Sequence, residues 1–201
     1  IDMHVHYPQL DIVGAPSEGL LPWLEDYTFP AESRFAEPAH AAAVAEQYAA
    51  RLQQQQSSVD KLKKLQPAPG VLLLLGHAGA SPLAAGRESL GDWLIERAGG
   101  RNLASHQGYK ALSVEALVAL DPEVLLVADR SVQGEAALTA LLQQNPALAS
   151  TRAVRDGRVL LVDPTLLVGG LGPRLPDQLA VLSAAFYPAT PPAVAEVSSY
   201  P

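Results

Sequence analysis

Hydrophobic residues form several short, unbroken runs and one long stripe, and these two patterns predict different elements. The runs at 71–75 and 124–128 are apolar throughout and are bounded by glycine, proline or charged residues. Runs of this length are typical of strands that are buried on both faces of a parallel sheet. Residues 158–163 predict a further strand, and residues 103–105 predict a short one at most.

A stripe of apolar residues between 38 and 66 predicts one long amphipathic helix, because its members recur at steps of three, four and seven residues. The stripe consists of Val44, Tyr48, Leu52, Val59, Leu62 and Leu65. Pro38 suits the first turn of a helix, and the prolines that follow residue 66 end it. We expect this helix to pack on the domain that follows. A coiled coil is the alternative, although the spacing is not a sustained heptad repeat.

Shorter helices are predicted between the strands. Residues 89–97 and 113–120 each begin with serine, a preferred N-cap, and are followed by Gly-Gly and by Asp-Pro. Residues 134–143 and 176–186 predict two more helices, and residues 146–150 a helical turn. Strands that alternate with helices predict an α/β fold with a parallel sheet, whose ligand site lies at the carboxyl ends of the strands.

Composition narrows the classes of protein. The 201 residues are 48% hydrophobic and 17% charged, which supports a packed core. The chain has no cysteine, which excludes disulfides, and a net charge of −7, which disfavours nucleic acid as a partner. The longest apolar runs fall far short of the ~20 residues of a membrane span. No signal peptide precedes Ile1, so we expect a mature, truncated or fragmentary chain.

Charge is distributed unevenly along the chain. The first 45 residues carry nearly all of the net negative charge, which is consistent with a boundary near residue 45. We therefore predict an amino-terminal segment at 1–45, a linker helix at 46–66, an α/β lobe at 67–189 and a flexible tail at 190–201. The tail is assigned from its proline and serine content and its lack of periodicity.

Two histidines near the amino terminus suggest half of a metal site. His4 and His6 are two residues apart, so both imidazoles lie on one face of a strand. Neighbouring imidazoles are common ligands of divalent metals. A pair of polar residues at a strand end is the plainer interpretation of this short pattern.

The flanking sequence adds to this pattern. IDMHVHYPQ, followed by GLLPWLEDYTFPAESRFAEPAHAAAVA, resembles the amidohydrolase family and its guanine deaminases. The resemblance implies that His4 and His6 bind zinc or iron and that Gln9 contacts a purine. However, the family's barrel needs about 250 residues, and a catalytic zinc takes three protein ligands plus water. After residue 45 only His77 and His106 remain, in unrelated contexts, so we expect no deaminase activity.

The remainder of the chain points to a different family. The resemblance depends on three motifs, LLLLGHAGASPLAAGRES, AGGRNLASHQGYKALSVEALVALDPEVLLVADR and NPALASTRAVRDGRVLLVDPTLLVGGLGPRLP. In that order they resemble the carboxy-terminal lobe of the haem-binding proteins of bacterial haem ABC importers, over about 46–189. The resemblance implies a periplasmic solute-binding protein of cluster A. Its fold would be a Rossmann-like α/β lobe with a parallel sheet, preceded by a long helix. In this chain we expect an irregular amino-terminal segment before that helix. Its partners would be haem and the ABC permease.

The resemblance also implies a binding site. Such proteins hold haem between two lobes, and a tyrosine of the amino-terminal lobe, which this chain does not contain, commonly ligates the iron. Arg174 is our main candidate to stabilise the tyrosinate or the haem propionates, since a guanidinium is permanently charged. His77 is a candidate axial or second-haem ligand, and Tyr109 and Arg87 are further candidates. The ordinary alternatives are a loop histidine, a salt-bridge arginine and a packing tyrosine.

Three functions thus compete at this point. The first is a haem carrier for an ABC importer, weakened by the missing lobe unless the chain dimerises. The second is a fragment of a guanine deaminase, which would be an enzyme. The third is a fusion of two unrelated pieces that binds nothing well. The length of the matching segments favours the first, and we expect no catalytic residues.

Overall fold

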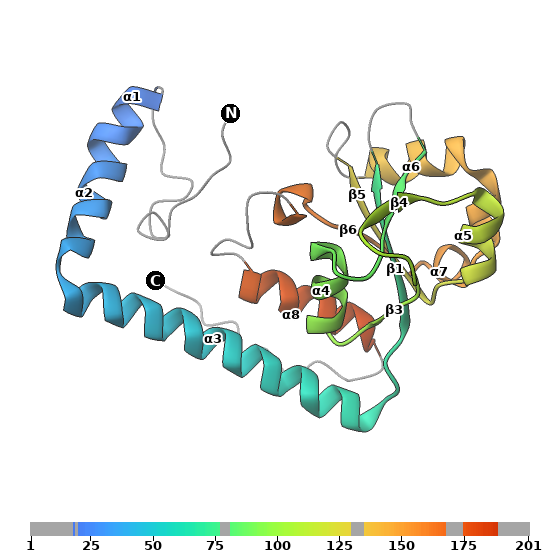
Figure 1. Ribbon diagram of the computed structural model, residues 1–201, viewed down its shortest axis with the longest axis horizontal. Coiled ribbons are helices and arrows are strands. Elements are labelled where there is room, and N and C mark those ends of the chain that lie inside the picture. The colour runs from blue at the N-terminus through green and yellow to red at the C-terminus, as the bar shows by residue number, and fades with distance from the viewer. Residues whose placement is uncertain (1–17, 19, 77–80, 130–134, 168–174, 189–201) are drawn as a thin grey trace, which may run out of the picture.

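A computed structural model of the chain describes residues 18, 20–76, 81–129, 135–167 and 175–188 (Figure 1). An α/β lobe forms the larger part. A long helix runs along one side of this lobe, and a helical arm rises from the far end of the long helix (Figure 1). The predicted fold class is therefore confirmed.

The sheet of the lobe is built around two buried strands, β1 (Gly70–Gly76) and β5 (Val124–Asp129), which are parallel and paired along their whole length. β6 (Val159–Leu161) pairs with β5, and β3 (Arg101–Asn102) pairs with the start of β1, both in parallel. Among the described residues the order is β4-β2-β1-β5-β6, with β3 also beside β1. The strands predicted at 71–75 and 124–128 are thus confirmed, and the predicted third and fourth strands are shorter or shifted by two residues.

One side of the sheet differs from the prediction. β2 (Leu83–Ala85) is antiparallel to β1, and β4 (Tyr109–Ala111) is antiparallel to β2. The sheet is therefore mixed, whereas the sequence predicted a parallel one. Three-residue strands with the sequences LAA and YKA are too short to show a period of two, which is why the pattern missed them.

Both faces of the sheet are buried, which explains the unbroken apolar runs. Alternate residues of β1 and β5 point to opposite faces and join two separate cores. One face is covered by α4 (Leu90–Arg97) and α8 (Leu175–Phe186). The other face is covered by α5 (Val114–Leu120), α6 (Glu135–Gln144), the 3-10 turn η4 (Pro146–Ser150) and α7 (Arg152–Arg155).

The predicted helix starts are confirmed in atomic detail. The Ser89 side chain accepts a hydrogen bond from the Asp92 backbone at 3.1 Å, and the Ser113 side chain accepts one from Ala116 at 3.2 Å. Each bond satisfies a backbone donor that the first helical turn leaves unpaired. Gly99 ends α4 with a φ of 96°, a left-handed conformation that favours glycine. Local sequence therefore sets the bounds of α4 and α5.

The long helix is α3 (Pro38–Leu65), and it packs on the lobe as predicted. Val59 is fully buried, and Leu52 and Leu62 contact the core on the side of α8. Polar contacts add to this seam: Arg51 pairs with Asp177 at 2.7 Å, and Gln55 donates to Ser183 at 2.9 Å.

The apolar stripe of α3 ends sooner than the sequence indicated. Leu65 was predicted to belong to it but is 73% exposed, because it lies in the last turn, where the chain leaves for β1. α3 also runs through the predicted boundary at residue 45 without a break. The division into domains itself stays a prediction.

The segment before α3 is helical where the sequence predicted an irregular one, so that expectation was wrong for residues 20–36. Its elements are α1 (Leu20–Trp23), the π turn η2 (Leu24–Thr28), α2 (Phe29–Ser33) and the 3-10 turn η3 (Arg34–Ala36). The proline of α2 lies in its first turn, where a missing N–H is tolerated. No helix of the described residues is long and apolar enough to cross a membrane.

An aspartate at the end of α5 ties that helix to α7. Asp121 adopts a left-handed conformation, with a φ of 39°, and its carboxylate accepts hydrogen bonds from the backbone N and Nε of Arg152, each at 2.8 Å. The backbone hydrogen bond is the larger of the influences that hold the pKa of Asp121 below its ordinary value of 3.8, and the guanidinium lowers it further. A carboxyl group whose pKa is lowered by folding stabilises the fold above its unfolded pKa, and this contribution is lost as the pH falls through its folded pKa.

We therefore expect Asp121→Asn to be less stable than the parent chain at pH 7, with a difference that shrinks as the pH falls below about 4. Asparagine tolerates the left-handed conformation, so the substitution removes the charge and one of the two acceptor oxygens without straining the backbone. The measurement is urea unfolding of both proteins at several pH values between 7 and 3. A difference that stays constant down to pH 3 would contradict the assignment.

Candidate functional site

The carboxyl ends of β1 and β5 lie next to each other and form the edge at which a parallel sheet offers a ligand site. Gly76, the last residue of β1, is in register with Asp129, the last residue of β5. β6 ends level with Val127, and the Val162 backbone donates to the Val127 carbonyl at 2.8 Å, which brings Asp163 toward the same edge. The segments that follow Gly76 and Asp129 therefore begin at neighbouring positions.

Gly76 has a specific steric role at this edge. A Cβ at this position would lie 3.0 Å from Cγ of Asp129 and closer still to its Oδ2. An added Cβ would require the Asp129 carboxylate, which lies across the end of β1, to shift. The Gly76–Asp129 pair therefore brings a negatively charged group to the start of the segment that carries His77.

Four of the predicted site residues lie outside the described residues: His77, Arg174, His4 and His6. The roles assigned to them stay predictions. Within the described part of the chain, no three histidine, aspartate or glutamate residues lie close enough together to hold a metal ion.

Tyr109 and Arg87 lie on the lateral side of the sheet, where β4 is separated from β1 by β2. Tyr109 is the first residue of β4, where it pairs with Ala85. Its hydroxyl accepts a hydrogen bond from the Gly91 backbone at 3.2 Å, so it joins β4 to the first turn of α4. Arg87 is exposed and forms an isolated bridge with Gln107. β2 therefore separates Tyr109 from β1, and the roles predicted for Tyr109 and Arg87 stay predictions.

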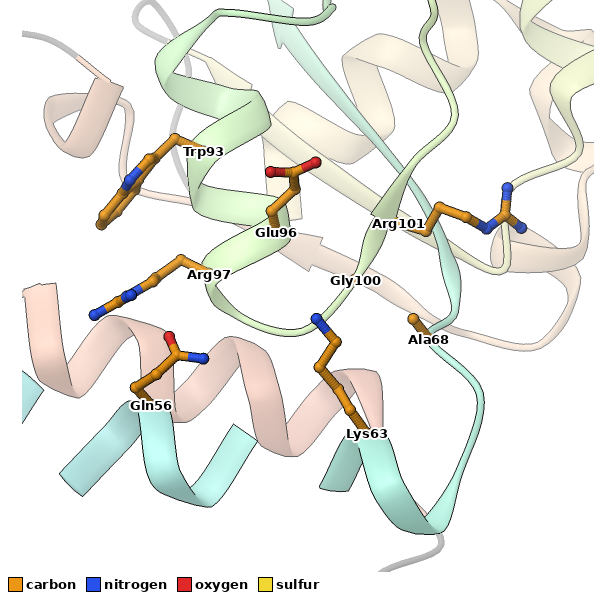
Figure 2. A pocket seen from close by; sticks show the side chains of 8 residues that line it. All are labelled: Gln56, Lys63, Ala68, Trp93, Glu96, Arg97, Gly100 and Arg101. Carbon is orange, nitrogen blue, oxygen red and sulfur yellow. The ribbon is translucent and has the colours of Figure 1, made fainter. Parts of the chain in front are cut away.

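A pocket of about 550 Å³ lies at the opposite end of β1, between α3 and α4 (Figure 2). Its lining residues are Gln56, Lys63, Ala68, Trp93, Glu96, Arg97, Gly100 and Arg101. This pocket was not predicted from the sequence. Trp93 and Arg97 are four residues apart on one predicted helix, a spacing that places them on the same face, and this was a detectable signal.

Comparison with known proteins identifies relatives for most of the chain. Residues 33–166 match the periplasmic binding protein family. The structure is similar to that of a periplasmic haem-binding protein from Pseudomonas aeruginosa, with 58% sequence identity, a TM-score of 0.73 and coverage of 80% of this chain. It is also similar to the periplasmic haem-binding protein BhuT in complex with two haems, with 34% identity, a TM-score of 0.61 and coverage of 73% of this chain. The chain spans only 57% and 55% of the length of those two proteins.

Two shorter matches concern a different kind of protein. The chain is 54% identical over 35 residues to the guanine deaminase of Escherichia coli K12, which is 17% of this chain and 8% of that enzyme. It is 44% identical over 48 residues to the probable guanine deaminase of Deinococcus radiodurans, or 24% of this chain and 11% of that protein. The deaminase resemblance is thus real in sequence but confined to a small part of each protein.

Proposed function

The chain belongs to the periplasmic binding protein family, and from this premise we propose that it binds haem for delivery to the permease of an ABC importer in the periplasm. The observation that supports this most directly is the 58% identity to the periplasmic haem-binding protein from Pseudomonas aeruginosa, over 80% of this chain. Haem is here the transported ligand and not a resident cofactor.

We propose the carboxyl edge of the sheet as the place of binding. His77 follows Gly76 directly, and Arg174 directly precedes Leu175, the first residue of α8. An imidazole suits the iron, and a guanidinium suits a propionate, with which it can form two parallel hydrogen bonds. Both residues flank elements whose packing is fixed by the core, and such elements hold a site in place.

Tyr109 and Arg87 have smaller parts in this proposal. The Tyr109 hydroxyl accepts a hydrogen bond from Gly91, and its strand lies at the side of the sheet. We therefore propose that it positions α4 and does not ligate iron. Arg87 lies beside Gln107 on the same lateral edge, so we place it outside the haem contact.

One lobe supplies one face of a cleft. Because the chain spans little more than half the length of its haem-binding relatives, we propose that it holds haem less tightly than they do, unless a second copy covers the exposed face. Loss of contacts on one face of a ligand removes both apolar burial and the exclusion of water.

A hemin titration followed by the Soret band tests the proposal. We expect a saturable spectral change with the parent chain, and an affinity lowered about tenfold in His77→Ala and in Arg174→Ala, as for loss of an iron ligand or a charged hydrogen bond. Arg155→Ala, an exposed arginine on α7, is the matched control and should bind like the parent. The absence of saturation, or equal binding by all four proteins, would contradict haem binding at this edge.

The alternative function, a guanine deaminase fragment, rests on the short matches to that enzyme. We propose binding and not catalysis, because two histidines supply fewer ligands than a catalytic zinc requires. Guanine turnover in the presence of added zinc, lost in His4→Ala and His6→Ala, would favour the enzyme. A chain that neither binds hemin nor turns over guanine would be the non-functional fusion.

A further inference from the structure

We infer that the pocket between α3 and α4 binds a small, elongated polyanion, at a site separate from the proposed haem edge. The two sites lie at opposite ends of the same strand. Gly100 and Arg101 of the pocket are beside Gly70, the first residue of β1, whereas the haem edge begins at Gly76. The inference does not depend on the proposed function.

Charge is the first argument. Three basic side chains line the pocket, from Lys63, Arg97 and Arg101, against the single carboxylate of Glu96. None of the three cations has an ion pair or a side-chain hydrogen bond with another described residue. The chain as a whole carries a net charge of −7, so the positive charge of the pocket is opposite in sign to that of the whole chain. Unpaired cations in a concave site raise the local concentration of anions.

The arrangement of the cations indicates the shape of the ligand. In Figure 2 Lys63 lies between the two arginines, with Arg97 beside Trp93 on one side and Arg101 on the other. Arg101 points away from Trp93, so one compact anion would not reach all three groups. A chain of linked phosphate or carboxylate groups matches this order.

At one end of the pocket, the Trp93 ring restricts the position of the Arg97 guanidinium. The Arg97 guanidinium lies 5.9 Å from the centre of the Trp93 ring, within the range of a cation–π interaction. Trp93 is 39% exposed, so the indole covers one side of Arg97 and leaves the rest open to the pocket. A guanidinium that is already ordered loses less entropy when it binds an anion.

A buried acceptor supplies a second, independent observation. Gln56 donates from Nε2 to Asp60 at 2.9 Å, but its Oε1 is buried and has no hydrogen-bond partner among the described residues. A buried polar atom without a partner is costly. A ligand hydroxyl, such as that of a hydrogen phosphate or a hydroxy acid, would satisfy it. The ligand class is therefore a small polyanion that also offers a hydrogen-bond donor.

The fluorescence of Trp93 gives a direct measurement. The chain has two tryptophans, so Trp23→Phe makes Trp93 the sole reporter. Inorganic tripolyphosphate and citrate, the two probes, are titrated separately at low ionic strength, with sodium chloride of equal ionic strength as the reference. We expect a saturable change with at least one probe, and which one binds tells phosphate from carboxylate chemistry. No saturable change with either, or the same change with sodium chloride, would overturn the inference.

Two substitutions in the pocket are expected to change the affinity for the anion in opposite directions. In the same background, Lys63→Gln should weaken the affinity about fivefold, and Glu96→Gln should strengthen it about threefold, as for loss of one partly exposed charge pair. Lys64→Gln is the matched control, because Lys64 is exposed on the same helix and does not line the pocket. Equal effects of Lys63→Gln and Lys64→Gln, or weaker binding by Glu96→Gln, would overturn the inference, provided that circular dichroism shows each variant folded.

Discussion

Gly86→Ala is expected to lower the free energy of unfolding by at least about 3 kcal/mol, because three backbone hydrogen bonds lie at the point of the clash. A Cβ on Gly86 would lie 2.6 Å from Cδ2 of His106, 2.8 Å from its carbonyl carbon and closer still to its carbonyl oxygen. Backbone atoms cannot rotate away as a flexible side chain can. The loop 105–108 would have to move. This would disturb the hydrogen bonds from Gly86 N to Gly108 O at 2.8 Å, from Arg87 N to His106 O at 2.7 Å and from Gly108 N to Arg87 O at 2.9 Å.

The matched control is Gly108→Ala in the same loop. Gly108 has a φ of 66° and open space around its Cβ position, so alanine there carries only the cost of the left-handed conformation, about 1 kcal/mol. Urea unfolding of both variants separates the clash from conformational strain. Equal decreases in the free energy of unfolding for the two variants would contradict the close contact between Gly86 and the backbone of His106. Because this loop leads into β4, we also expect Gly86→Ala to weaken the Tyr109 contact with α4.

Leu126→Ala is expected to lower the free energy of unfolding by about 3 kcal/mol, because it removes a large, fully buried side chain from the core of the lobe. Leu126 lies in the middle of β5, is fully buried, and pairs with Leu73 of β1 on one side and Leu160 of β6 on the other. Neighbours held in a paired sheet cannot collapse into the space, so the loss of burial and the remaining cavity both add to the effect. The midpoint and slope of urea unfolding measure it.

Leu161→Ala is the comparison for Leu126→Ala. Leu161 is a leucine in the same sheet, but it lies at the end of β6 and is 42% exposed. We expect it to lose less than about 1 kcal/mol, since much of its side chain already contacts water. Equal losses for the two variants would mean that β5 is not the centre of the core. Because β5 ends at Asp129, loosening it should also weaken hemin binding at the proposed edge.

The sequence by itself determined the elements whose signals are local. The runs at 71–75 and 124–128 are unbroken because both faces of β1 and β5 are covered, and hydrophobicity alone reports this. Ser89 and Ser113 mark helix starts because an N-cap bond spans only three residues. The long helix also follows from short-range periodicity. The family followed from motifs that occur in a fixed order, and the comparisons confirmed it.

The candidate sites were predicted less completely. The carboxyl edge of the sheet follows from the order of strands and helices, so its place was predictable. The position of the Tyr109 side chain was not predictable. Its hydroxyl accepts a hydrogen bond from Gly91, which lies 18 residues earlier in the chain. The pocket was missed for the same reason: Lys63 belongs to α3 and Arg97 to α4, and no periodicity within either helix shows that they meet.

Tertiary structure alone decided the features that depend on distant partners. β2 and β4 are three residues each, and they are strands only because β1 offers an edge and they pair with each other. Gly76 and Gly86 look alike in sequence, yet one leaves room for the Asp129 carboxylate and the other for the backbone of His106. Leu65 fits the apolar stripe of α3 but lies in solvent. For the two strands and the two glycines the deciding contact is made by atoms far away along the chain, and local patterns carry no information about such contacts.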